Sequence, residues 1–141
     1  MANRKDAKDW AREHMKGLWT SPMYPFTQDF KLDEQGIRNN VEYMLKVKST
    51  GLGFGFSEPW VCSHAERILA FETATDAVRK RVPAYVHTTD HSVEETINFT
   101  KRAMAIGADA VMIWAPYEWA KTQDMVIEYY EYVASKVDIA I

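Results

Sequence analysis

Short apolar runs alternate with longer amphipathic segments along this sequence. The apolar runs cover residues 18–25, 52–56, 82–87 and 108–115, and each gives way to proline or to polar residues. Three of the four runs are nearly continuous in apolar residues, which is typical of parallel strands that are buried on both faces of a sheet. The pattern therefore predicts an α/β fold built on a parallel sheet.

Each predicted strand is followed by a signal for the start of a helix. Asp33 and Thr122 are N-cap candidates, and two Ser-x-x-Glu sequences that begin at Ser63 and Ser92 have the spacing of capping boxes. Apolar side chains recur at helical spacing behind Asp33, at Ile37, Val41, Met44 and Leu45. We expect helices over about 33–50, 63–78, 92–107 and 122–137.

The strand–helix unit recurs about every 30 residues, which is the rhythm of a (β/α) barrel or of a doubly wound sheet. No Gly-x-Gly-x-x-Gly loop opens a helix, so a dinucleotide site is disfavoured. Residues 139–141 resemble the start of a fifth strand, and a complete barrel has eight units over about 250 residues. We expect the N-terminal half of a (β/α)8 TIM barrel; a half-barrel that pairs with itself is the alternative.

A further helix is predicted ahead of the first strand, over residues 6–16. Trp10 and His14 share one of its faces, and Gly17 is a stop signal. We interpret residues 1–17 as a helical prefix that covers one end of the fold. Residues 18–141 then form the partial TIM-barrel domain.

Composition narrows the class of protein. The net charge is −3, with 17 basic and 20 acidic residues that are well mixed, so a nucleic-acid partner is not expected. No apolar run reaches the roughly 18 residues of a membrane span, and no apolar segment of a secretory signal follows the polar N-terminus. The single cysteine, Cys62, allows no internal disulfide and suits a reducing compartment. We therefore expect a cytoplasmic protein.

Candidate chemistry lies where the strands end, because ligands bind at the carboxyl ends of strands in such folds. Ser57 and Glu58 leave the second strand; Ser57 is a candidate for the pocket wall, whereas Glu58 either acts as an acid or base or organises the loop. Trp114 and Tyr117 end the fourth strand and are candidates for an aromatic wall of the barrel mouth. Trp60 and Trp119, just past strand ends, are candidates for a lid over an aromatic or other apolar substrate.

His87 ends the third strand and forms a His-x-x-Asp-His sequence with Asp90 and His91. Such side chains can bind a metal ion, which leaves a metal-dependent barrel hydrolase or aldolase open as a second hypothesis. The alternative interpretation is a hydrogen-bonded loop histidine, because only one strand end supplies ligands. A third hypothesis is a non-catalytic half-barrel that acts as an assembly module.

Several short motifs occur in a fixed order from Leu18 to the end of the chain. They are Pro25-Phe-Thr-x-Asp29, Asn40-Val-Glu-Tyr43, Gly55-x-x-Glu58, Ser63-x-x-Glu-Arg67, Gly107-Ala-Asp-Ala-Val111 and Pro116-Tyr117. In order and spacing the chain resembles the dihydrodipicolinate synthase and N-acetylneuraminate lyase family. The resemblance implies a TIM-barrel lyase of the aldolase or hydratase-aldolase type. In that family a lysine forms a Schiff base with pyruvate or another 2-oxo acid, without a metal or other cofactor.

The resemblance also implies roles for individual residues. Ser57 lies near the family's paired-threonine loop, where a hydroxyl binds the substrate carboxylate and relays protons, and Phe56 stands where another hydroxyl is expected. Tyr117 matches the first tyrosine of a Pro-Tyr-Tyr motif, and Glu118 replaces the second tyrosine, which in many members acts from a neighbouring subunit. The expected catalytic residues are thus Tyr117 and Ser57. The expected substrate-binding residues are Ser57, Phe56, Glu58, Tyr24, His87 and Glu118.

The family's Schiff-base lysine and main catalytic tyrosine would lie beyond Ile141, in the C-terminal half of the barrel. None of the ten lysines here lies inside an apolar strand, where burial would lower its pKa for imine formation. We therefore expect the 141-residue chain alone to be inactive. The resemblance further implies a homo-oligomer, tetrameric in full-length relatives.

Overall fold

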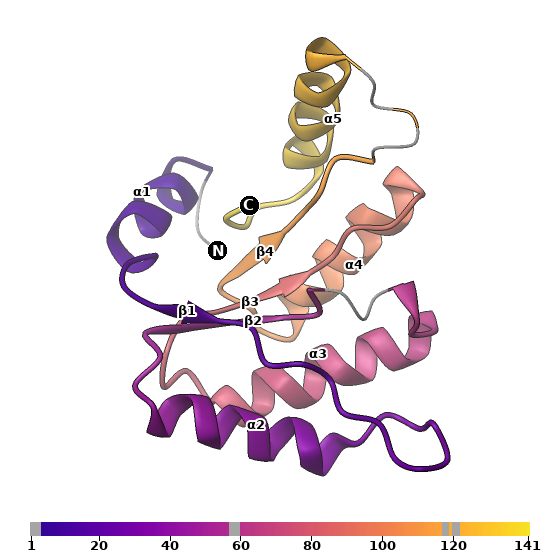
Figure 1. Ribbon diagram of the computed structural model, residues 1–141. Coiled ribbons are helices and arrows are strands. Elements are labelled where there is room, and N and C mark those ends of the chain that lie inside the picture. Colours follow the sequence, from indigo (N-terminus) through magenta and orange to yellow (C-terminus); the bar gives the residue numbers. More distant parts are fainter. Residues whose placement is uncertain (1–3, 57–59, 117–118, 120–121) are drawn as a thin grey trace.

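A single parallel sheet organises the molecule (Figure 1). The computed structural model describes residues 4–56, 60–116, 119 and 122–141. The sheet consists of β1 (Trp19–Thr20), β2 (Gly51–Phe54), β3 (Ala84–His87) and β4 (Ala110–Met112), in the order β1-β2-β3-β4. Doubly wound sheets reverse their strand order at a switch point. The sequential order therefore decides between the two predicted architectures in favour of a barrel-type sheet.

Five helices accompany the strands in the described part of the chain: α1 (Arg4–His14), α2 (Glu34–Lys46), α3 (His64–Val78), α4 (Val93–Ala105) and α5 (Gln123–Lys136). The helices α2 and α3 lie side by side beneath the sheet, as Figure 1 shows. Ala7 and Trp10 of α1 share a cavity of about 340 Å³ with Ala108 and Ile139, so α1 lies near the start of β4. No helix among the described residues is long and apolar enough to cross a membrane.

The helix starts follow the local sequence closely, with one exception. Ser63 and Glu66 form the predicted reciprocal capping box, and Asp33 and Thr122 each accept a backbone hydrogen bond from the residue three positions later. Ser92 accepts from the Glu95 amide, but its own amide donates to Asp90 Oδ1 at 3.2 Å. The second predicted capping box is therefore only half formed, because a loop carboxylate takes the place of the glutamate.

The strands are shorter than the apolar runs that predicted them. At β4 the reason is a side chain: the Trp114 amide donates to Thr89 Oγ1 at 2.7 Å instead of continuing the backbone ladder. At β1, Pro22 and Pro25 supply no amide hydrogen for pairing. The expected fifth strand begins as a parallel bridge between Ala110 and Ala140, next to β4.

The two faces of the sheet are packed differently. On the face toward the helices, here called the outer face, Leu52, Phe54 and Val86 are at most 1% exposed and belong to the hydrophobic core. The opposite, inner face carries the side chains of Trp19 and Tyr85, whose rings stack with centroids 5.6 Å apart. Side chains from alternate strands fill the interior of a TIM barrel in this way.

Glycines of β2 make room for the two inner-face rings. A Cβ atom at Gly51 would lie 2.3 Å from Trp19 Cε2, and one at Gly53 would lie 2.0 Å from Tyr85 Cζ. The Gly-x-Gly sequence of β2 is therefore explained by aromatic rings that cross over it from β1 and β3. A cavity of about 610 Å³ lies beside this layer, lined in part by Tyr85, Met112 and Ile141.

Candidate functional site

The carboxyl ends of β2, β3 and β4 bring polar and aromatic side chains together. Phe56 follows β2, the segment 87–90 ends β3, and Trp114 follows β4; Trp60 lies beside them. Four expected site residues, Ser57, Glu58, Tyr117 and Glu118, lie outside the described residues, and their roles stay predictions.

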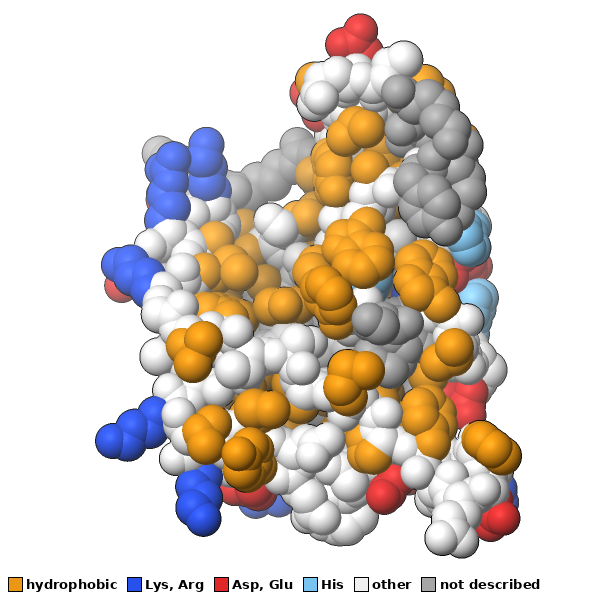
Figure 2. Space-filling model, viewed as in Figure 1, with side chains coloured by type: hydrophobic (Ala, Val, Ile, Leu, Met, Phe, Trp, Pro, Cys, Tyr) orange, Lys and Arg blue, Asp and Glu red, His pale blue; other side chains and the backbone are white. Residues whose placement is uncertain are grey.

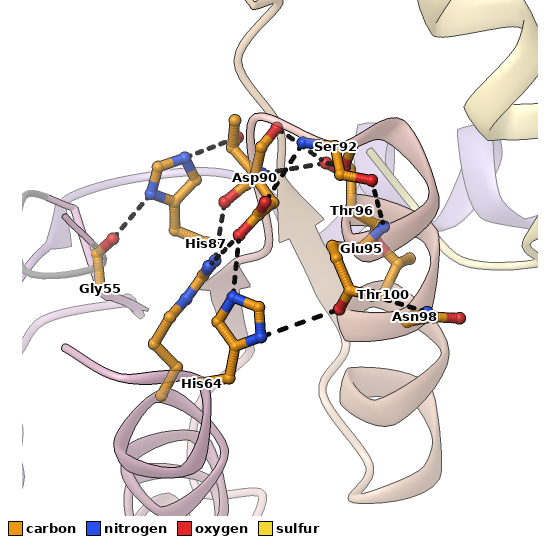
Figure 3. Close-up of polar contacts among 11 residues, drawn as sticks. Gly55, His64, His87, Asp90, Ser92, Glu95, Thr96, Asn98 and Thr100 are labelled. Atoms are coloured by element: carbon orange, nitrogen blue, oxygen red, sulfur yellow. Dashed lines mark hydrogen bonds and ion pairs between the residues drawn. The ribbon is translucent and has the colours of Figure 1, made fainter.

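His87 lies at the centre of this region and is 0% exposed. Its Nδ1 is 2.8 Å from the Gly55 carbonyl oxygen, and its Nε2 is 2.7 Å from Thr89 Oγ1 (Figure 3). A carbonyl can only accept, so Nδ1 carries a hydrogen. Thr89 Oγ1 already accepts from the Trp114 amide and can donate its own hydrogen to Nε2. The His87 ring is thus held between the Gly55 carbonyl and the Thr89 hydroxyl.

This arrangement does not favour the metal hypothesis. Both ring nitrogens of His87 are engaged with protein atoms, and Asp90 accepts from Arg67 at 3.0 Å. Within the described ranges, no group of three or more His, Cys, Asp or Glu side chains is placed to hold a metal ion. The geometry instead agrees with the alternative interpretation of His87 as a hydrogen-bonded histidine.

Arg67 joins α3 to the end of β3. Its side chain is 3% exposed, and it donates to the Thr89 carbonyl at 2.7 Å and to Asp90 Oδ2 at 3.0 Å. Its guanidinium carbon lies 3.9 Å from the centre of the Phe99 ring. Burial lowers the pKa of the Arg67 guanidinium, and the charge of Asp90 opposes that shift. Arg67 thus holds the backbone of Thr89, the residue whose hydroxyl contacts His87 and Trp114.

His64, at the start of α3, lies at the outer edge of the same cluster. Its Nε2 is 3.5 Å from Asp90 Oδ2 and its Nδ1 is 3.9 Å from Glu95 Oε2 (Figure 3). Its side chain is 60% exposed, so these contacts face solvent. The sequence identifies Arg67 only as part of a family motif and gives no signal for Thr89, which lies among the polar residues of the loop 88–92.

Tyr24 and His87, expected to line the pocket, meet at Gly55. Gly55 has φ +78°, and a Cβ atom there would lie 3.3 Å from the Tyr24 hydroxyl oxygen and 3.7 Å from His87 Cβ. Tyr24 is 5% exposed, so both side chains lie beneath the surface of the strand ends. Contact of either residue with a substrate stays a prediction.

Three aromatic side chains form the exposed part of the region, and we call Phe56, Trp60 and Trp114 the aromatic wall. Phe56 contacts Trp114 edge to face with centroids 5.3 Å apart, and Trp60 lies 6.5 Å from Trp114. Phe56 is 46% exposed and Trp60 is 43% exposed. Trp114 also packs on His87, with ring centroids 4.5 Å apart.

Trp119, the other predicted lid residue, lies elsewhere. Its ring packs edge to face on Tyr129 of α5, with centroids 5.6 Å apart. These two side chains border a cavity of about 290 Å³ together with Val93, Met125 and Tyr132. In this structure Trp119 is therefore separate from the aromatic wall.

Comparison with known proteins shows where the chain has relatives. The model of the "Dihydrodipicolinate synthetase family" matches residues 14–141. A 4-hydroxy-tetrahydrodipicolinate synthase of Syntrophus aciditrophicus (strain SB) is 34% identical over 128 residues, which cover 89% of this chain and 44% of that protein. The corresponding enzyme of Protochlamydia amoebophila (strain UWE25) is 29% identical and is covered to 43% of its length. The chain thus spans less than half the length of these relatives.

Solved structures agree with the sequence matches. A prophage protein of the dihydrodipicolinic acid synthase family from E. coli K12, in complex with pyruvate, is 30% identical and superposes with a TM-score of 0.81 over 87% of this chain and 42% of its own. An N-acetylneuraminate lyase from Fusobacterium nucleatum is 25% identical, with a TM-score of 0.81 over 86% of this chain and 43% of its own. The predicted resemblance is confirmed, as is the predicted fold, the N-terminal half of a (β/α)8 barrel.

Proposed function

This chain belongs to the dihydrodipicolinate synthetase family, and we propose that it forms the N-terminal half of a lyase that acts on pyruvate or another 2-oxo acid. The observation that carries the proposal is the likeness to the E. coli K12 family member that was solved with pyruvate. The carboxyl ends of β2, β3 and β4 provide the corresponding half of a substrate site, since barrel enzymes bind their substrates at this end.

The Schiff-base lysine of this proposal comes from the C-terminal half of the barrel. The lysine side chains that the structure describes are exposed: Lys8, Lys16, Lys31, Lys46, Lys48, Lys80, Lys101 and Lys136. A lysine that forms an imine near neutral pH needs a lowered pKa, which burial provides. These eight lysines have no such environment.

The residues of this chain would bind and orient the 2-oxo acid. By resemblance, Ser57 holds its carboxylate and Tyr117 relays a proton. Phe56 replaces a hydroxyl at the neighbouring position and packs on Trp114 instead. We therefore propose that proton relay in this protein depends on fewer hydroxyl groups than in typical family members. We also propose a homo-oligomer, which light scattering of the full-length protein would test.

Borohydride trapping tests the proposed chemistry directly. The full-length protein is incubated with pyruvate and sodium borohydride, and the adduct is located by mass spectrometry. We expect one modified lysine, in the C-terminal half, and none in the isolated 141-residue chain treated in the same way. A full-length protein that acquires no covalent adduct would contradict the proposal.

A further inference from the structure

The N-terminal helix α1 lies at the end of the sheet opposite to the candidate site. It leads into the amino end of β1, and it borders Ala108 and Asp138, which precede β4 and the fifth strand. The family model begins at residue 14, so almost all of α1 lies ahead of the part of the chain that the model matches. Membership of the family therefore does not explain what α1 does.

One face of α1 is turned toward the sheet. Ala7, Trp10 and Ala11 are half-buried and recur at helical spacing, whereas the opposite side carries four exposed charged residues: Lys8, Asp9, Arg12 and Glu13. Besides the cavity shared with Ala108, the helix borders one of about 350 Å³ with residues 137–141. Figure 2 shows hydrophobic side chains between α1, at the upper left, and the rest of the molecule. The apolar face of α1 thus packs on the amino ends of β4 and of the fifth strand.

The turn from α1 into β1 is fixed to the start of β2. Thr50 Oγ1 lies 2.8 Å from the Lys16 carbonyl oxygen and 3.0 Å from the Leu18 carbonyl oxygen. Gly17, between them, has φ +81°, and a Cβ atom there would lie 2.6 Å from Thr50 Oγ1. The turn thus requires a glycine, and its hydrogen bonds set the direction in which α1 leaves β1.

The helix reaches from the first strand to the fifth. The sheet has the order β1-β2-β3-β4, and the bridge between Ala110 and Ala140 adds the fifth strand beyond β4. Met15, directly after α1, borders the cavity of about 610 Å³ beside the inner-face residue Tyr85. Five strands at about 4.8 Å from one to the next cover about 19 Å around a curved sheet, and a helix of 11 residues is about 16 Å long. The helix is therefore long enough to cross the open end of the half-barrel.

Charge favours the same contact. Asp138 borders two of the cavities beside α1, and its Oδ1 atom is buried without a hydrogen-bond partner among the described residues. Lys8 and Arg12 border one of these cavities. Opposite charges attract more strongly near a protein surface than in bulk water, so the carboxylate favours the side of α1 that carries these two cations.

We propose that α1 is a strap across the amino-terminal end of the barrel. It ties the first strand to the fifth, and it thereby fixes the curvature with which this half of the barrel meets the other half. The strap lies at the end of the barrel where residues serve stability rather than catalysis. The inference does not depend on the proposed lyase function.

The test removes the strap from the full-length protein by deletion of residues 2–13. The melting temperature should fall by about 5 °C, the size of shift that the loss of a few half-buried apolar side chains produces. Amide hydrogen exchange at residues 137–141 should become about tenfold faster, while exchange in β2 changes much less, because only the fifth strand loses its cover. Unchanged exchange at residues 137–141 would overturn the strap. An equal rise in β2 would overturn it as well, because the helix would then add only general stability.

Point variants locate the effect on α1. Trp10→Gln and Glu13→Gln introduce the same side chain on the sheet-facing and the exposed side of the helix. Trp10→Gln should reproduce part of the faster exchange at residues 137–141, whereas Glu13→Gln should leave it unchanged. Gly17→Ala keeps every side chain of α1 but displaces the turn, so it should speed the same exchange. Equal effects of the two glutamine variants, or no effect of Gly17→Ala, would contradict the proposal.

Discussion

The outer and inner faces of the sheet differ in how fully their side chains are covered by the rest of this chain. On the outer face, Leu52, Phe54 and Val86 are sealed by helices that come from this chain. On the inner face, Trp19 and Tyr85 stack on each other but border a cavity of about 610 Å³. In a barrel the interior is filled by side chains from all of its strands. The outer face is thus fully packed by this chain, whereas the side chains of the inner face are only partly packed.

The largest effect should come from a deletion on the outer face. Phe54→Ala removes a ring that is 1% exposed and should lower the free energy of unfolding by about 3–5 kcal/mol. Tyr85→Ala, its inner-face counterpart, should cost clearly less because part of the Tyr85 ring already borders open space. Urea denaturation of both variants measures the difference. Equal losses would show that the two faces are packed alike.

A smaller loss of stability is expected from a substitution of Arg67, beside the carboxyl end of β3. Arg67→Met keeps much of the side-chain volume but removes the hydrogen bonds to Thr89 and Asp90, and should cost about 2–3 kcal/mol. The matched control is Arg38→Met, which breaks an exposed ion pair with Asp76 and should cost less than about 1 kcal/mol. Thermal unfolding would contradict this prediction if the two variants lost the same stability.

A substitution of Gly53, in β2, tests whether the Tyr85 ring on the inner face requires a glycine beneath it. Gly53→Ala places a methyl group about where the Tyr85 ring lies, and should cost about 1–3 kcal/mol through forced movement of that ring. In the double variant with Tyr85→Leu, the cost of the alanine should largely vanish. Additive costs in this double-mutant cycle would argue against ring contact as the cause.

The smallest effect concerns alkaline pH. Burial raises the pKa of the Tyr85 hydroxyl on the inner face and that of Tyr129 in the core. A raised folded-state pKa means that the unfolded chain releases its proton first, so stability is fully present below about pH 10 and falls as the pH rises further. Tyr85→Phe should make this fall shallower and leave the contribution of Tyr129. An unchanged slope in denaturation between pH 9 and 11 would contradict the assignment.

The sequence predicted where the candidate site lies but not which hydrogen bonds join its residues. Strand-end residues such as His87 and Trp114 were identified because parallel strands place their carboxyl ends at one edge of a sheet. The hydrogen bonds that join them depend on Thr89 and Arg67, which lie 22 positions apart in the sequence. Their burial shows that these polar side chains need partners, but local sequence reveals neither the burial nor the partner.

Local sequence by itself determined the helices, the number of strand–helix units and the capping box at Ser63. These features depend on spacing and on hydrogen bonds between residues three or four positions apart. Tertiary structure decided the strand order and the contact of His87 with the Gly55 carbonyl, since each depends on atoms distant in sequence. It also explained Gly51 and Gly53, over which rings from β1 and β3 lie. The two kinds of feature differ because helix starts and periodicity depend on residues close in sequence, whereas packing depends on residues that only the folded chain brings into contact.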